Sequence, residues 1–189
     1  MKNFRILAMA LVTIVSFSSC SDDDSASTPV NEEEVITTVT ATFMPTSTGG
    51  TAVVLKSQDL DGDGPNAPVV TATGNFKAGA TYNGSVTFLN ELSNPAGSIT
   101  DEIHEEADDH QIFFQQNGLG TFSYADIDAN GKPVGLEFKY TAAATPVTGS
   151  LIVTLRHLPN KSGANVAAGD ITNAGGGTDA EVVFPVTIQ

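Results

Sequence analysis

The sequence predicts an all-β protein, an antiparallel β-sandwich of the immunoglobulin-like or a related kind, with one short helix. Short runs of Val, Ile, Thr, Phe and Tyr with alternating polarity recur along the chain, and clusters of Gly, Pro and Asn separate them. Helical segments do not alternate with these runs, which excludes parallel βαβ units. At this spacing we expect about eight to ten strands, packed in two layers.

Nine segments carry the strand pattern. In the first of them Val39 and Phe43 fall on one face, because successive side chains of a strand point to opposite faces. The expected strands span residues 35–43, 51–57, 69–73, 81–89, 111–115, 121–127, 134–141, 150–156 and 181–188. Together they make one domain, which is long enough to bury a core without disulfides.

One segment departs from this pattern and predicts a short amphipathic helix over residues 98–110. Ser98 is a good N-cap, and acidic residues follow it in the first turn. Ile99, Ile103 and Ala107 recur every four residues, so they would form the apolar face of the helix.

The first twenty residues predict a bacterial lipoprotein signal. Lys2 and Arg5 precede about a dozen apolar residues, and small residues then lead to Cys20, the only cysteine. The apolar run is shorter than the roughly 20 residues that a transmembrane helix needs. Phe17-Ser18-Ser19-Cys20 resembles a lipobox, so we expect the cysteine to be acylated. The expected organisation is a signal peptide at 1–19, a lipidated flexible tether at 20–33 and a β-sandwich domain at 34–189.

Charge and composition limit the classes of ligand and activity that we expect. Loss of Lys2 and Arg5 with the signal takes the formal net charge from −14 to −16, which repels nucleic acid and favours a cation or a basic partner. Common metalloprotease, phosphate-loop and hydrolase motifs are absent from the sequence, and a chain without Trp is poorly suited to carbohydrate. We therefore expect a non-enzymatic protein anchored by lipid in the outer membrane, with the acidic run at 22–24 favouring the cell surface.

One acidic loop is a candidate calcium site. Asp59, Asp61 and Asp63 alternate across a turn that glycine permits, and carboxylates so close repel one another unless they are solvated or bound to a metal. Val70 stands at the twelfth position, where an EF-hand has Glu. The loop therefore predicts calcium binding without the complete EF-hand pattern.

A second loop, with Asp126, Asp128, Asn130 and Glu137 at positions one, three, five and twelve, satisfies the written EF-hand pattern. Its flanking segments have the pattern of strands, whereas an EF-hand loop joins two helices. Asn130-Gly131 favours a type I′ hairpin turn instead. The hairpin is the preferred interpretation, and these residues are weaker metal candidates.

The histidines suggest a transition-metal site. Glu106 and His110 are four residues apart in the expected helix, as are the weaker candidates His104 and Asp108, so each pair would share a helical face. His157 has the parity of the apolar face of its strand, and it could join His110 and a carboxylate on zinc or another transition metal. The preferred interpretation is that His157 bonds to loop backbone and the helix charges face solvent, with the metal site as the alternative.

Five segments carry a family resemblance. They are DLDGDGPNAP at 59–68, EEADDHQIFF at 105–114, DIDANGKPVG at 126–135, LRHLPNK at 155–161 and GDITNAGGGTDAEVVFPVT at 169–187. The chain resembles small flavobacterial-type (Bacteroidetes) lipoproteins often labelled type 1 periplasmic binding fold proteins. That label implies a longer, two-lobed α/β fold, with which the β pattern disagrees.

The resemblance implies capture of a ligand for an outer-membrane TonB-dependent receptor, and it directs attention to His110 and His157. The first functional hypothesis is therefore a lipoprotein that binds a cation or a metal-bearing ligand for delivery to that transporter. The alternative is a structural or adhesive surface domain in which calcium stabilises the loop from Asp59 to Asp63.

Overall fold

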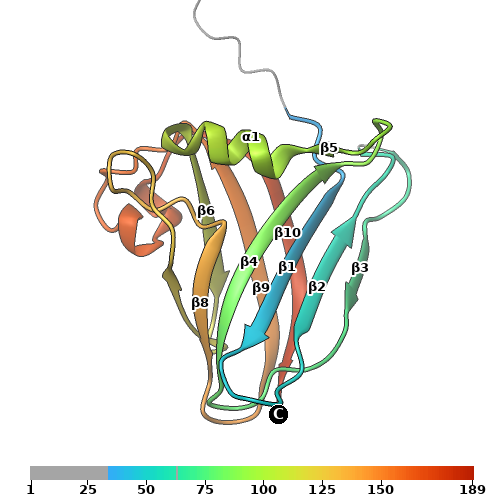
Figure 1. Cartoon of the computed structure of the whole chain (residues 1–189), viewed down its shortest axis with the longest axis vertical. Helices are drawn as coiled ribbons and strands as arrows, with labels where there is room; N and C mark the ends of the chain where they lie inside the picture. Colours follow the sequence, from blue (N-terminus) through green and yellow to red (C-terminus); the bar gives the residue numbers. More distant parts are fainter. Residues whose placement is uncertain (1–33, 63) are drawn as a thin grey trace, which may run out of the picture. The chain divides into compact units, whose positions relative to one another are not determined.

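A computed structural model describes residues 34–62 and 64–189, which form two antiparallel β-sheets and one short α-helix (Figure 1). The β-sandwich predicted from the sequence is confirmed, and its ten strands lie within the expected number. The predicted signal peptide, Cys20 and the tether lie outside the described residues, as does Asp63.

The larger sheet contains seven strands in the order β3-β2-β1-β4-β8-β7, with β5 paired to β4 off this path. Their bounds are β1 Thr38–Pro45, β2 Val53–Gln58, β3 Val69–Ala72, β4 Thr81–Asn90, β5 Gly97–Ser98, β7 Gly120–Tyr124 and β8 Glu137–Ala142. All of these strand pairs are antiparallel. The predicted strands match this sheet to within a few residues, but the two-residue strand β5 was not predicted.

The smaller sheet has the order β10-β9-β6. Its strands are β6 His110–Gln116, β9 Val147–His157 and β10 Gly177–Ile188. Strands β6 and β7 follow each other in the chain but belong to different sheets, and each is an edge strand. The two sheets therefore meet along a seam between β6 and β7.

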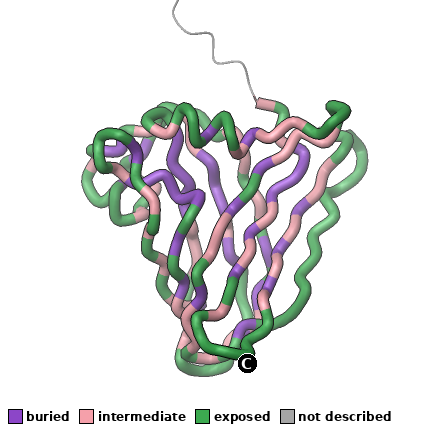
Figure 2. Tube along the Cα trace, in the orientation of Figure 1, coloured by how far each residue is buried: buried purple, intermediate pink, exposed green. Residues whose placement is uncertain are grey.

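The core fills the space between the sheets. Val39, Ala41 and Phe43 of β1 are buried, which confirms the predicted inward face of this strand, and buried residues alternate with more exposed ones along the strands (Figure 2). Phe43 makes edge-to-face contacts with the rings of Phe76 at 4.8 Å and Tyr140 at 5.5 Å between centroids.

Helix α1, Ile99–Glu105, lies at the end of the sandwich where β6 begins and β9 ends (Figure 1). The Ser98 side chain accepts a hydrogen bond from the backbone N–H of Asp101, and Ile99 and Ile103 are buried, as predicted. The expected extension of this helix to residue 110 is wrong. The chain leaves the α-helix at Glu106, continues as a 3₁₀ turn, and has already become a strand at His110.

Three 3₁₀ turns complete the structure, with bounds Ala107–Asp109, Val166–Ala168 and Ile171–Asn173. The last two bring Val166 and Ala174 against Phe113, on the side of the smaller sheet that faces away from the main core. Within the described residues, no helix is long and apolar enough to cross a membrane.

Candidate metal centre

Two of the three histidines meet at the α1 end of the smaller sheet. His110 opens β6, His157 closes β9, and the two residues are register partners. Their rings stack with centroids 4.8 Å apart and an interplanar angle of 10°. His157 has the parity of the buried residues Val153 and Leu155, so its position matches the sequence prediction.

The third strand of this sheet adds a carboxylate. The register between β9 and β10 shifts between Thr178 and Ala180, and Asp179 is the extra residue at this irregularity. A bulge of this kind re-aims one side chain relative to the ordinary strand alternation. The Oδ2 atom of Asp179 lies 3.8 Å from Nε2 of His110, and only 4% of the Asp179 side chain is exposed.

Two glutamates complete the cluster. The Oε1 atom of Glu34, just before β1, lies 3.9 Å from Nε2 of His110, and Glu106 approaches from the end of α1. The potential ligand atoms form two sets, each within 4.8 Å, which share His110: one with His157 and Asp179, the other with Glu34 and Glu106. Four chain segments therefore converge on one imidazole.

The hydrogen bonding of His110 fixes its tautomer. Its Nδ1 lies 3.0 Å from the backbone carbonyl oxygen of Glu106, and because a carbonyl only accepts, Nδ1 donates. In the neutral ring, Nε2 then carries a lone pair. His110 is fully buried, and its Nε2 makes no hydrogen bond to any described residue. A histidine whose other nitrogen donates to a carbonyl is the usual arrangement of a metal ligand.

Two distances within the cluster are compatible with one small ion between the groups. The distances of 3.8 and 3.9 Å from Nε2 of His110 to the two carboxylates exceed a hydrogen bond. Two bonds of about 2.0–2.2 Å to a shared zinc ion span at most about 4.4 Å. Two imidazoles with carboxylate oxygens match zinc and other transition metals, whereas calcium prefers six to eight oxygen ligands.

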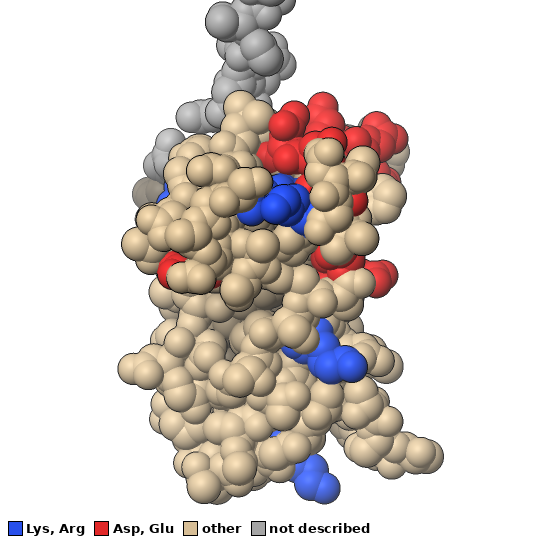
Figure 3. All heavy atoms as spheres, turned by 90° about the vertical axis from the view of Figure 1, so that its left-hand side faces the viewer, with Lys and Arg blue, Asp and Glu red and all other residues tan. Residues whose placement is uncertain are grey.

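Negative charge accumulates around this cluster. Burial, followed by the charges of Asp179, Glu102 and Glu106, raises the pKa of Glu34 from 4.5 to about 7. Acidic side chains also gather at this end of the molecule in the view of Figure 3. A bound cation would offset the repulsion among these carboxylates.

The weaker candidates from the helix do not join the centre. His104 and Asp108 are exposed, and neither belongs to a metal-binding cluster among the described residues. Glu106 and His110 do come together, although not on one helical face as predicted. They meet because the chain turns sharply between them, which places the Glu106 carbonyl against the imidazole.

The Asp59 loop uses its described carboxylates in its own turn. Asp59 accepts hydrogen bonds from the backbone N–H groups of Asp61 and Gly62, and Asp61 accepts from the side chain and backbone of Asn66. The hydrogen bond from the Asn66 side chain contributes most to lowering the pKa of Asp61. Because Asp63 lies outside the described residues, calcium binding here stays a prediction.

The second acidic loop is a hairpin, as the preferred interpretation stated, but its turn is not type I′. Ile127 pairs with Pro133, the N–H of Gly131 donates to the carbonyl of Asp128, and only Gly131 has a positive φ, of 73°. A type I′ turn would require a positive φ at Asn130 as well. The loop is therefore wider by one residue, with the glycine in the left-handed position.

Hydrogen bonds within this hairpin occupy its two aspartates. Asp126 accepts from the backbone N–H groups of Gly135 and Glu137. Asp128 accepts from two backbone N–H groups of the turn and, at 2.9 Å, from the buried ammonium of Lys161. Burial alone would raise the pKa of Asp128, but the hydrogen bonds from Lys161 and Lys132 and the Lys161 charge lower it overall.

Comparisons of the chain with protein-family models, with curated proteins and with solved structures find no match. The assignment of the site therefore depends on its own geometry. Sequence reasoning missed Asp179 and Glu34. Asp179 follows three glycines that predicted only a loop, and Glu34 lies next to the stretch assigned to the tether.

Proposed function

We propose that this chain is a cell-envelope lipoprotein whose β-sandwich binds a divalent transition-metal ion, of which zinc is the best fit. His110, His157 and Asp179 would supply the ligands, and Glu34 and Glu106 would add carboxylate oxygens from the second set. The observation that carries this proposal is the fully buried Nε2 of His110, which is held in the ligand tautomer and faces carboxylates beyond hydrogen-bond distance.

Burial of two of the proposed ligands supports metal retention over catalysis. The side chains of His110 and Asp179 are 1% and 4% exposed, whereas His157 and Glu34 are half-buried and Glu106 is exposed. The acidic residues on and after α1 would raise the local concentration of cations at this end of the domain. Delivery of the ion to an outer-membrane TonB-dependent receptor is the part of the proposal that rests on the family resemblance.

The test is zinc titration of the purified chain by isothermal calorimetry, after chelator treatment and without a polyhistidine tag. We expect one zinc ion per chain. For His157→Gln we expect a loss of roughly 100-fold in zinc affinity, because the total binding free energy of a structural zinc ion, about 10–16 kcal/mol, is divided among several ligands. His104→Gln is the matched control, because this third histidine is exposed and outside the cluster.

Two results would contradict the proposal. One is the absence of saturable zinc binding by a chain that is folded by circular dichroism. The other is an equal loss of affinity in His104→Gln and His157→Gln, which would place the ion on the surface. Thermal melting of each variant in chelator separates loss of a ligand from loss of the fold.

A further inference from the structure

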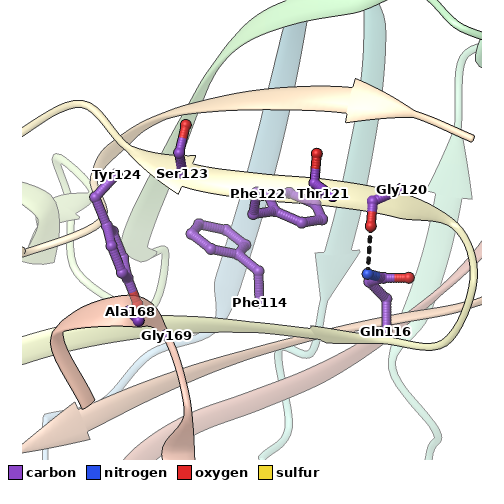
Figure 4. A pocket seen from close by; sticks show the side chains of 9 residues that line it. All are labelled: Phe114, Gln116, Gly120, Thr121, Phe122, Ser123, Tyr124, Ala168 and Gly169. Carbon is purple, nitrogen blue, oxygen red and sulfur yellow. Dashed lines mark hydrogen bonds between the residues drawn. The ribbon is translucent and has the colours of Figure 1, made fainter. Parts of the chain in front are cut away.

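The seam between β6 and β7 contains a second feature, which is separate from the metal centre. A cavity of about 230 Å³ opens between the two edge strands (Figure 4). Phe114 and Phe122 form its floor, and Tyr124 and the turn at Ala168 and Gly169 lie at one end. Drug-sized pockets usually measure about 300–1,000 Å³, so this cavity suits a smaller molecule.

Side-chain bridges close the seam at both ends. At one end the amide of Gln116, on β6, donates to the carbonyl oxygen of Gly120, on β7, at 2.7 Å. At the other end the hydroxyl of Tyr124, on β7, donates to the carbonyl oxygen of Ile112, on β6, also at 2.7 Å. The opening is therefore a bounded window, and an extended peptide could not run through it without breaking a bridge.

The floor of the window is aromatic. The rings of Phe114 and Phe122 stack with centroids 4.8 Å apart and an interplanar angle of 3°, and both residues are only partly buried. Both rings pack against the main core. Because β6 and β7 are separated here, the core is open to solvent at this point. An apolar ligand placed here would remove aromatic surface from water.

The rim of the window consists of main-chain groups. Just before β6, the carbonyl of Asp109 accepts from the N–H of Leu158, which follows β9. Within β6, the N–H of Ile112 donates away from β9, to the carbonyl of Val134. Alternation then turns the main-chain groups of Phe114 towards the seam. On either side of β7, the carbonyl of Leu119 accepts from the N–H of Ala143, and the N–H of Ala125 donates to the carbonyl of Glu137. Both bonds lie on the β8 side, so alternation turns the main-chain groups of Phe122 towards the seam as well. The window thus offers amide donors and carbonyl acceptors above an apolar floor.

The lining is uncharged, although the chain as a whole is strongly acidic. None of the nine lining residues, all of them in the described part of the chain, carries a charged side chain at neutral pH. Burial raises the pKa of Tyr124 to about 12, so its hydroxyl stays protonated. An anionic ligand would find no counter-charge in this window.

We infer that the window between β6 and β7 is a binding site for a small neutral molecule with an apolar body and one amide, carbonyl or hydroxyl group. The aromatic floor takes the apolar body, and the main-chain rim takes the polar group. The two bridges favour such a molecule over an added peptide strand.

The probe is benzamide, titrated into the uniformly ¹⁵N-labelled chain and followed by amide chemical shifts. We expect saturable shifts centred on Phe114, Phe122 and Tyr124. Benzoate has nearly the same shape but carries a negative charge, so it should bind at least roughly tenfold more weakly. The capped peptide acetyl-tetra-alanine-amide should not shift these residues.

A variant pair localises the site. Ala168→Phe places a bulky side chain at the lining position and should weaken benzamide binding at least tenfold. Ala167→Phe is the control, because Ala167 lies in the same exposed 3₁₀ turn but does not line the cavity. Both variants should bind zinc like the parent chain. This measurement checks that they are folded without using the window itself.

Three results would overturn the inference. They are equal shifts from benzamide and benzoate, equal benzamide binding by the two Phe variants, and stronger binding of the tetra-alanine peptide than of benzamide. The last result would identify the seam as a site for strand addition.

Discussion

The hairpin at Asp128 and the centre at His110 are both rich in carboxylates, but they differ in what their polar atoms already bind. The Asp128 oxygens accept hydrogen bonds from the turn backbone and from Lys161. At the other centre, Nε2 of His110 is buried without a hydrogen bond to the described residues, and two carboxylates lie 3.8 and 3.9 Å away. A carboxylate whose oxygens already accept hydrogen bonds is therefore a weaker metal candidate than a buried imidazole nitrogen that has no hydrogen bond to the described residues.

The largest expected effect on stability comes from the hairpin. Asp128→Ala removes the carboxylate partner of Lys161, whose side chain is only 6% exposed, and leaves a buried positive charge with the Ala107 carbonyl as its remaining acceptor. We expect the free energy of unfolding to fall by about 3–5 kcal/mol, measured by urea denaturation in chelator. Zinc affinity should stay within about twofold of the parent, since no described cluster of metal ligands includes Asp128. A folded Asp128→Ala chain that no longer binds zinc would instead indicate that the hairpin, and not the His110 cluster, binds the metal.

The next effect concerns the candidate metal centre. Asp179→Asn keeps the size of the side chain but removes its charge, and we expect a loss of roughly 10- to 100-fold in zinc affinity by calorimetry. Asp108→Asn is the matched control, because Asp108 is exposed at the same end of the domain. Similar affinities for the two variants would exclude Asp179 as a ligand.

Without bound metal, the cluster around His110 should make the free energy of unfolding depend on pH through Glu34. Burial, then the charges of Asp179, Glu102 and Glu106, raise the folded-state pKa of Glu34 from 4.5 to about 7. The folded chain therefore binds more protons than the unfolded chain between these values, so the Glu34 contribution is present below pH 4.5 and is lost as pH rises towards 7. The loss is at most about 3 kcal/mol.

Glu34→Gln isolates this contribution, because Gln does not titrate. Urea denaturation in chelator at pH 4.5, 6 and 7.5 should show a steeper loss of stability in the parent than in the variant. Parallel profiles for the two chains would mean that Glu34 titrates normally.

The smallest effect is expected at the Asp59 loop. Asp61 is exposed, and its carboxylate accepts hydrogen bonds only within its own turn, so Asp61→Asn should leave the melting temperature nearly unchanged, with or without added calcium. This result would weaken the alternative of a calcium-stabilised surface domain. A rise in melting temperature with calcium that disappears in Asp61→Asn would instead support that alternative.

Much of the fold was predictable from local patterns. Alternation identified the strands and the inward face of Val39, Ala41 and Phe43, and the Ser98 cap identified the start of α1. The end of the helix was not predictable in the same way, because acidic residues continue through the 3₁₀ turn to His110. The strand β5 has only two residues, so it is too short to show an alternation of polar and apolar residues.

Only part of the candidate centre was predictable. The parity of His157 in its strand is a local property, and it proved sufficient to place this residue. Asp179 depends on a bulge that shifts the alternation of β10, and Glu34 reaches the site through the path of the chain before β1. Neither feature leaves a periodic signal in the sequence.

The most direct test of the central claim is a crystal structure of the zinc-loaded chain, with diffraction data collected on both sides of the zinc absorption edge. The account predicts one anomalous peak per chain within about 2.0–2.2 Å of Nε2 of His110, an imidazole nitrogen of His157 and a carboxylate oxygen of Asp179. A peak at the Asp59 loop or at the Asp126 hairpin, with none beside His110, would contradict it.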